Sequence, residues 1–272
     1  MLNCSEIIDF FNLENSHAKK ELGQNFLINK KVCENIVNEL VINENDKVLE
    51  IGPGLGALSD ILINKCNDLT LVEYDAKFVN FLQLSYKDKS NVKIIKNNII
   101  KEKDGGYNRV IGNLPYYMTT EILQFITQKL EKFESGVFMV QKECLKRLIA
   151  LDGKDYSAFN VYLNYGYKIT TSFEVKRNNF FPIPNVDSIV FKVDKKDNVN
   201  INFNKKIYKI ASILFLNRRK TILNNLNSYI KDKEKSITIL NNCNLSDNLR
   251  AEQLKVKDYE TLANEMIKMD LL

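Results

Sequence analysis

The segment "NLPYY" at residues 113–117 directly follows an apolar run that is typical of a β-strand. Proline interrupts strands and helix interiors, so one explanation is a tight turn leading into a helix after Thr120. The alternative is a clamp for a flat polar ring. The Asn113 side-chain oxygen and the Leu114 carbonyl can accept both hydrogens of an exocyclic amino group. Pro115 fixes the loop, and Tyr116 offers a ring face for stacking.

A glycine-rich turn, "VLEIGPGLGALS" at residues 48–59, provides a second candidate site. Gly52 and Gly54 lie between a strand-like run and a helix-like run, where glycine lets the backbone approach a ligand closely and the helix start presents free N–H groups. Glu73 follows 21 residues after Gly52, at the end of the next expected strand, and its carboxylate can accept both ribose hydroxyls. The pattern predicts a site for a nucleoside-containing cofactor, with NAD as one candidate.

Strand-like and helix-like segments alternate from residue 46 to residue 193. This alternation predicts a doubly wound α/β sheet with helices on both faces. The last two strands have only a loop between them, which predicts an antiparallel hairpin at one end of the sheet. Expected strands are 47–51, 69–72, 92–95, 109–111, 136–140, 165–175 and 188–193; expected helices are 57–65, 76–86, 120–130 and 142–150. The glycine-rich turn and the NLPY loop then meet at the carboxyl edge of the sheet.

A linker at residues 194–204 separates this region from residues 205–272, whose sequence predicts helices throughout. We therefore expect a catalytic domain at residues 1–198, with an N-terminal arm and helices at 1–45, and a small all-helical domain at 199–272. The helical region from residue 201 contains 13 Lys and Arg against 8 Asp and Glu, whereas the first 200 residues contain 26 of each. An excess of positive charge confined to one domain is consistent with a polyanionic partner, although surface lysines also serve solubility.

Composition excludes several other classes of protein. No apolar run approaches the ~20 residues of a membrane span, and the N-terminus lacks the pattern of a secretory signal. Five widely spaced cysteines without a CxxC pair argue against a disulfide framework or a zinc site, so we expect a cytoplasmic protein that needs no metal. The single histidine, His17, has no nucleophile motif beside it, which argues against Ser-His-Asp and Cys-His mechanisms.

Six motifs occur together and in a fixed order along nearly the whole chain. They are "LGQNFLINKKVCENIV" (22–37), "LEIGPGLGALS" (49–59), "VEYD" (72–75), "GNLPYYMTT" (112–120), "NNFFPIPNVDSIVF" (178–191) and "FLNRRKTILNNL" (215–226). The acid Glu50 before the glycines resembles motif I of S-adenosylmethionine (SAM) methyltransferases, and NLPY resembles the clamp of enzymes that methylate exocyclic amino groups. Together the motifs resemble the KsgA-type ribosomal RNA adenine N6,N6-dimethyltransferases, which act on two adjacent adenosines near the 3′ end of small-subunit rRNA.

The resemblance implies a Rossmann-like SAM-dependent methyltransferase sheet of seven strands and a set of site residues. SAM, with S-adenosylhomocysteine as its product, would contact Asn25, Leu27, Gly52, Gly54, Glu73, Asn98 and Asn113. Asn98 stands where the family usually has Asp, and Asn97 is the neighbouring alternative. Phe180 matches the aromatic residue that would hold the target base against Tyr116, with Phe181 as its neighbour. The clamp residues Asn113, Leu114, Pro115 and Tyr116 would be catalytic.

The same resemblance implies a small ribosomal subunit as the partner. Lys205, Lys206, Arg218, Arg219 and Lys220 would hold the RNA backbone, and the protein would act as a monomer without a membrane. Related enzymes of macrolide resistance methylate large-subunit rRNA and share the first four motifs, but "NRRKTILNNL" fits the KsgA-type pattern. A non-catalytic RNA-binding factor, an NAD-dependent oxidoreductase and a DNA adenine methyltransferase are further alternatives. The "QNFL" segment and the C-terminal "RRK" argue against the DNA enzyme.

Overall fold

A computed structural model describes residues 1–18 and 24–272 of the protein. Leu22 and Gly23, the first residues of the expected motif at 22–37, lie outside the described residues. The chain divides into two compact units, Met1–Leu145 with Ile169–Asp194 and Lys146–Lys168 with Lys195–Leu272. In the described residues, no helix combines the length and the apolar character needed to cross a membrane.

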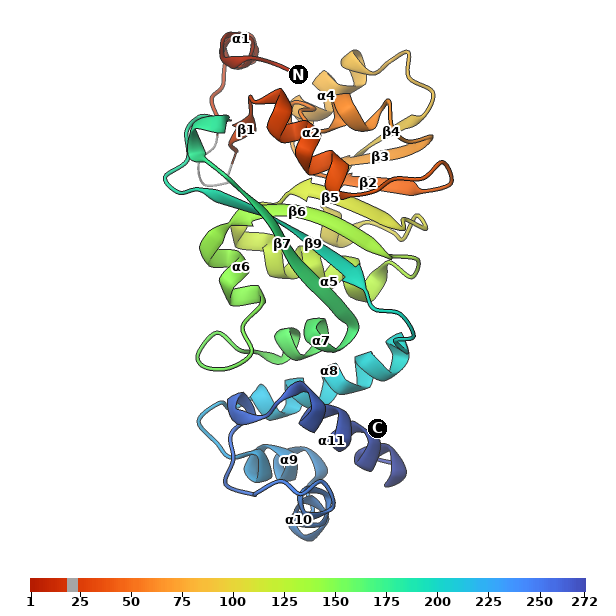
Figure 1. Ribbon diagram of the computed structural model, residues 1–272, viewed down its shortest axis with the longest axis vertical. Coiled ribbons are helices and arrows are strands. Elements are labelled where there is room, and N and C mark those ends of the chain that lie inside the picture. The colour runs from red at the N-terminus through yellow and green to blue at the C-terminus, as the bar shows by residue number, and fades with distance from the viewer. Residues whose placement is uncertain (19–23) are drawn as a thin grey trace. The chain divides into compact units, whose positions relative to one another are not determined.

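The first unit contains a seven-stranded sheet (Figure 1) with strand order β4-β3-β2-β5-β6-β9-β7. The strands are β2 (Lys47–Ile51), β3 (Asp68–Glu73), β4 (Val92–Lys96), β5 (Arg109–Asn113), β6 (Ser135–Gln141), β7 (Tyr167–Val175) and β9 (Ser188–Lys195). The pairs β2–β3, β2–β5, β3–β4 and β5–β6 are parallel, whereas β9 runs antiparallel to β6. This topology brings the carboxyl ends of β2, β3, β4 and β5 to one edge, where ligands of such sheets bind.

Apolar residues cover both faces of the central strands, as expected for a largely parallel sheet. Cys33, Ile36 and Val37 of α2 (Lys30–Glu39) belong to the same buried cluster as Val48 and Ile111 of the sheet. Helices α3 (Ser59–Leu62) and α4 (Ala76–Ser85) also contribute to this cluster. Figure 1 shows α2 in front of the sheet and α5 (Thr119–Lys129) behind it. The helices therefore bury the two faces and leave the carboxyl edge open.

A small two-stranded sheet and an N-terminal helix complete this unit. Strand β1 (Phe26–Leu27) pairs antiparallel with β8 (Phe180–Phe181), which joins the "QNFL" and "FFPIP" motifs. Helix α1 (Cys4–Leu13) begins with a capping box formed by Asn3 and Glu6. Ile7 and Phe11 of this helix pack with Phe26, Leu55 and Phe78. The N-terminal arm is thus fixed to the glycine-rich turn by an apolar cluster of its own.

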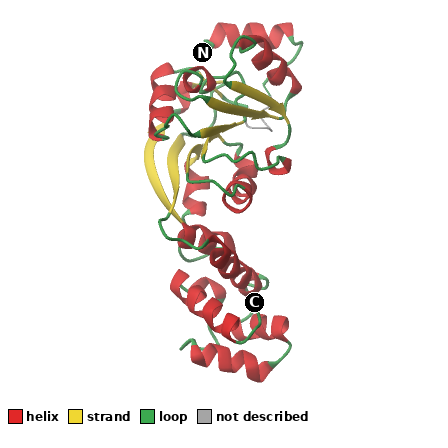
Figure 2. Cartoon of the chain, turned by 90° about the vertical axis from the view of Figure 1, so that its right-hand side faces the viewer, coloured by secondary structure: helices red, strands yellow, loops and turns green. Residues whose placement is uncertain are grey.

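The second unit is built mainly from helices (Figure 2). They are α7 (Ala158–Gly166), α8 (Ile201–Phe215), α9 (Ile222–Ile230), α10 (Lys233–Asn242) and α11 (Val256–Lys268), joined by the C-terminal turn of α6 (Lys142–Leu148). Their core includes the fully buried Tyr156 and Tyr259, and the Tyr259 hydroxyl donates to the Ala251 carbonyl at 2.7 Å. Side chains of Asn200, Thr221 and Asp232 cap α8, α9 and α10.

Three expectations differ from the observed elements. The helix expected at 57–65 is regular only over Ser59–Leu62. The strand expected at 165–175 begins at Tyr167, because helix α7 extends to Gly166 and buries Val161 and Leu163. The second unit begins its C-terminal part at Lys195, close to the expected boundary at 199, but it also includes Lys146–Lys168. These residues belong there because α7 packs on α8 and α11.

Candidate active site

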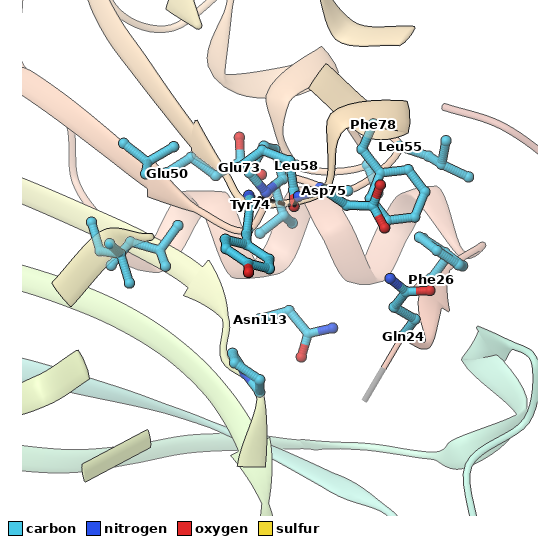
Figure 3. Close-up of a pocket in the computed structure, with 18 of the residues that line it drawn as sticks. Gln24, Phe26, Glu50, Leu55, Leu58, Glu73, Tyr74, Asp75, Phe78 and Asn113 are labelled. Carbon is cyan, nitrogen blue, oxygen red and sulfur yellow. Dashed lines mark hydrogen bonds between the residues drawn. The ribbon is translucent and has the colours of Figure 1, made fainter. Parts of the chain in front are cut away.

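A cavity of ≈ 440 Å³ opens at the carboxyl edge of the sheet (Figure 3), a size typical of small-molecule sites. Its lining comes from four strand ends and from the N-terminal arm. The lining includes all seven expected cofactor residues, which are Asn25, Leu27, Gly52, Gly54, Glu73, Asn98 and Asn113. The structure therefore brings all of the expected cofactor residues together around one cavity.

The glycine-rich turn approaches this cavity with its backbone. Gly54 has a φ of +57°, and a Cβ at this position would lie 3.2 Å from Cε1 of Phe26. Its N–H donates to Oε2 of Glu73 at 3.0 Å. A side chain here would both strain the backbone and press on the N-terminal arm, which explains the requirement for glycine.

Glu73 is held in place by three backbone donors. Besides the Gly54 N–H, the N–H groups of Tyr74 and Asp75 donate to Oε1 of Glu73 at 2.7 and 2.9 Å. Burial raises the pKa of this carboxyl, while the three hydrogen bonds oppose the shift. The arrangement fixes the carboxyl at the rim of the cavity, in the position where an acceptor for ribose hydroxyls is expected.

Glu50 lies deeper in the same cavity and is 1% exposed. The Ser59 hydroxyl donates to Oε2 of Glu50 at 2.6 Å. Burial raises the pKa of the Glu50 carboxyl to about 8, and the charges of Asp60 and Glu73 add to the shift. Two carboxyl groups thus give the cavity a negative character once they are ionised, which favours a cationic ligand.

The NLPY loop forms the opposite wall. Asn113 ends β5, and its Nδ2 donates to the Asn25 carbonyl at 3.3 Å, which leaves Oδ1 as the acceptor atom of this amide (Figure 3). The Leu114 N–H donates to the Met139 carbonyl at 3.0 Å. Pro115 lines the cavity and precedes the short 3₁₀ helix η3 (Tyr116–Met118). The loop is therefore anchored to β6 on one side and to the N-terminal arm on the other.

The expected aromatic residues differ in their placement. Burial raises the pKa of the Tyr116 phenol, and the neighbouring Ser188 and Gln141 side chains oppose the shift. Phe180 is 1% exposed and packs in the buried cluster that α2 forms with the central strands, and its side chain does not line the cavity. Tyr117, which the motifs did not single out, is 58% exposed and does line it. On the side of the NLPY loop, the exposed aromatic ring that lines the cavity is thus Tyr117, and Tyr74, 70% exposed, lines the cavity from the end of β3.

Both candidates for the usual Asp position lie at the cavity. Asn98 Oδ1 accepts from the Ile100 N–H at 3.2 Å and caps a short 3₁₀ helix. Asn97 Nδ2 donates to Glu102 at 2.6 Å, and its Oδ1 accepts from the Asn98 N–H at 2.8 Å. Each of the two amide oxygens thus accepts one backbone N–H, and Asn97 is held through its amide nitrogen as well, so the structure leaves both residues as candidates for the expected contact.

Further lining residues come from segments that sequence reasoning missed. Ile7 of α1, Phe78 of α4 and Met118 of η3 contribute apolar walls. Tyr74 and Asp75 follow Glu73 directly in the motif "VEYD", so their position gave a signal. Nothing in the sequence of α1 indicated its contact with the cavity.

The basic residues expected to bind RNA lie in the second unit and are not equivalent. Arg218 donates from Nη1 to the Lys154 carbonyl at 2.7 Å and from Nη2 to the Gly153 carbonyl at 2.9 Å. Lys206 Nζ lies 3.5 Å from the carbonyl of Leu272. Lys205, Arg219 and Lys220 are exposed. Arg218 is thus engaged within the protein, whereas the other two residues of "RRK" face solvent.

The described residues contain no group of three His, Cys, Asp or Glu side chains arranged to hold a metal ion.

A family model described as "Ribosomal RNA adenine dimethylase" matches residues 15–268. The chain belongs to this family.

Relatives in this family resemble the chain over nearly its whole length. "Ribosomal RNA small subunit methyltransferase A" of Mycoplasma mycoides is 36% identical over 258 residues, which cover 91% of this chain and 97% of the relative. The protein of the same name from Mycoplasmopsis pulmonis is 35% identical, covering 92% of this chain and 99% of its own.

Two solved structures share the fold. A dimethyladenosine transferase from Plasmodium falciparum has a TM-score of 0.77 at 23% identity, covering 90% of this chain and 98% of its own. The 23S rRNA methyltransferase ErmE has a TM-score of 0.68 at 17% identity, covering 89% of this chain and 100% of its own. At these identities the likeness concerns the fold, and it agrees with the expected methyltransferase sheet.

Proposed function

We propose that this protein transfers methyl groups from SAM to N6 of adenosines in small-subunit rRNA. Its membership of the adenine dimethylase family and the names of its relatives support this reaction class and this substrate. The observation that carries the proposal is that Asn113 lines the cavity while its Nδ2 donates to the Asn25 carbonyl, so that Oδ1 is the atom of this amide left to accept from a substrate. Two adjacent adenosines near the 3′ end are the expected targets, each receiving two methyl groups.

The cavity fits SAM by its size and by the polar groups that line it. Glu73 would accept the ribose hydroxyls, Asn98 would contact the adenine amino group, and Gly52 and Gly54 would allow close approach. Asn25 and Leu27 would close the site from the N-terminal arm. SAM supplies an electrophilic methyl group on a sulfonium, and S-adenosylhomocysteine remains after transfer. Burial raises the pKa of Glu50 and of Glu73, and a cationic cofactor would favour their ionised forms.

The protein's remaining task is to make a poor nucleophile react. The N6 lone pair of adenine is delocalised into the ring, so the amino group must be held in a pyramidal geometry. The Asn113 Oδ1 and the Leu114 carbonyl would accept its two hydrogens and direct the lone pair towards the methyl group. Pro115 fixes the loop, and either the expected Tyr116 or the exposed Tyr117 beside it would support the base. The proton becomes acidic only after transfer, so no general base is required.

The target base must leave its stack to reach the clamp, at a cost of roughly a few kcal/mol. Contacts to the RNA backbone offset that cost without reading sequence. Lys205, Lys206, Arg219 and Lys220 would make these contacts, while Arg218 supports the turn that carries its two neighbours. We expect a cytoplasmic monomer that needs no metal and acts on the assembling subunit.

Transfer from labelled SAM to small ribosomal subunits that lack the modification tests the proposal. We expect labelled N6-methylated adenosine in the small subunit, and at least a roughly 100-fold lower rate for Asn113→Ala with SAM binding retained. Labelling of large subunits instead would assign the chain to the resistance type. Binding of SAM without transfer to either subunit would contradict an enzymatic role.

A further inference from the structure

Two segments that lie 150 residues apart in the sequence are joined beside the cavity. Phe26 and Leu27 of β1 pair with Phe181 and Phe180 of β8. Directly after this pairing, the Ile28 N–H donates to the Asn179 carbonyl at 2.9 Å, and Asn29 Nδ2 donates to Asn179 Oδ1 at 2.8 Å. We refer to these two hydrogen bonds to Asn179 as the clasp.

Both amides of the clasp are held on their second side as well. Asn29 Oδ1 accepts from the N–H groups of Lys31 and Val32 at 3.0 and 3.3 Å, as the N-cap of α2. Asn179 Nδ2 donates to the Lys176 carbonyl at 2.8 Å. The oxygen of Asn29 and the nitrogen of Asn179 are thus already in use, which directs the remaining amide atoms towards each other.

The segment that the clasp holds contains two of the expected cofactor residues, Asn25 and Leu27. It also reaches the clamp, because the Asn25 carbonyl accepts from Asn113 Nδ2 at 3.3 Å. That hydrogen bond leaves Asn113 Oδ1 for the amino group of a substrate. Strand β1 has only two residues, so a displacement of this segment would move the Asn25 carbonyl away from Asn113.

We propose that Asn179 is a positioning residue that holds the N-terminal arm against the clamp through the clasp. It thereby links the closing of the cofactor site to the orientation of the Asn113 amide. This inference rests on the proposed function of the same site. A purely structural role would change stability alone, whereas a positioning role changes cofactor affinity and the rate of the chemical step.

Three variants separate the clasp from its surroundings. Asn179→Ala removes the side-chain acceptor of the clasp and keeps the backbone carbonyl, whereas Asn179→Asp keeps a side-chain acceptor for Asn29. Asn29→Ser keeps a good N-cap for α2 but is too short to reach Asn179. Asn242→Ala is the matched control, because Asn242 also makes an exposed side-chain hydrogen bond, to Glu265 at 2.7 Å in the second unit.

The measurements are the Kd for SAM by calorimetry and the single-turnover rate on small subunits at saturating SAM, with Tm as a check on folding. For Asn179→Ala and Asn29→Ser we expect a Kd raised roughly 3- to 10-fold and a rate lowered by a similar factor. Asn179→Asp and Asn242→Ala should stay within about twofold of the unchanged protein.

Two results would overturn the inference. One is an unchanged Kd and rate in a folded Asn179→Ala variant. The other is an Asn179→Asp variant as impaired as Asn179→Ala, which would assign the effect to the bond from Asn179 to Lys176. If the unchanged protein binds SAM but transfers no methyl group, the proposed function fails, and the Kd series still decides whether the clasp holds the arm.

Discussion

Glu50 is buried at the cavity, and its carboxyl has a pKa of about 8 instead of the usual 4.5. In the unfolded chain this group ionises near pH 4.5, whereas the folded protein keeps its proton up to about pH 8. The folded state therefore binds more protons in this window, and its stability falls as the pH rises through it. A cationic ligand in the cavity would reverse this preference by favouring the carboxylate.

We predict that Glu50→Gln removes this pH dependence. Between pH 5 and 8 the free energy of unfolding of the unchanged protein should fall by about 2–4 kcal/mol relative to that of the variant. Chemical denaturation at several pH values measures the difference. SAM affinity of the unchanged protein should rise over the same range, and the affinity of Glu50→Gln should not. Parallel stability curves for the two proteins would contradict the assignment.

Tyr117 and Phe180 differ in exposure, and their substitutions should differ accordingly. Tyr117 is 58% exposed at the cavity, whereas Phe180 is 1% exposed in the core. Tyr117→Ala should leave stability nearly unchanged and lower methyl transfer by roughly 5- to 100-fold, as expected for the loss of about 1–3 kcal/mol of base stacking. Phe180→Ala should destabilise the fold by about 3–5 kcal/mol through the cavity it leaves.

Unfolding curves and methyl-transfer rates on small subunits distinguish the two effects. Leu84→Ala, at a position that is 75% exposed on α4 outside the cavity lining, is the control for loss of exposed apolar surface. Full activity of Tyr117→Ala would show that its exposed ring is not used by the substrate.

At the level of elements, regular periodicity made most of the fold predictable. Each of the seven strands lies within two residues of its expected range, because β-branched runs between helical segments are a strong signal. The pairing of β1 with β8 could not be predicted, since a strand of two residues is too short to show an alternation of apolar and polar residues. Helix α7 was missed because its sequence, "AFNVYLNYG", is rich in residues that also favour strands.

The candidate site was likewise predictable where its residues belong to regular strands and their motifs. Five of the seven expected cofactor residues come from motifs at or just after the ends of β2 to β5, and the parallel topology gathers them at one edge. The buried position of Phe180 and the contribution of Ile7 depend on packing between distant segments, which the motifs do not encode.

The turn between α8 and α9 shows a division of roles among its basic residues. Arg218 binds two carbonyls of the loop at Gly153 and Lys154, and its guanidinium lies 5.4 Å from the centre of the Phe215 ring. We predict that Arg218→Ala lowers the free energy of unfolding by about 1–2 kcal/mol, whereas Arg219→Ala changes it by less than about 0.5 kcal/mol. Urea denaturation measures both.

Arg218→Lys tests whether the forked geometry matters. An ammonium group donates from a single point and does not reproduce two contacts to neighbouring carbonyls, so we expect Lys to restore only part of the stability. If Arg218→Ala and Arg219→Ala are equally stable, Arg218 has no special structural role and is again expected to contact RNA.

For the molecule as a whole, the uneven distribution of charge predicts where RNA affinity originates. The net charge of +5 arises entirely after residue 200. Neutralising phosphates releases counterions, so each cation that contacts the backbone adds roughly 0.7–0.9 to the slope of log K against log salt concentration. Residues that touch phosphate should therefore affect the salt dependence of binding, whereas cations elsewhere on the surface should not.

We predict that replacing both Arg219 and Lys220 by Gln lowers this slope by about 1.5 for binding to unmodified small subunits. The matched control replaces Lys87 and Lys89, two exposed lysines of the first unit, by Gln and changes the net charge equally. Filter binding between 50 and 200 mM salt, about the range in which such slopes are steep, separates the two. If both double variants lose the same slope, the effect is one of total charge, and the C-terminal unit has no special part in holding the RNA. If only the Arg219 and Lys220 variant loses it while its affinity for SAM is unchanged, RNA holding and cofactor binding reside in different units of the chain.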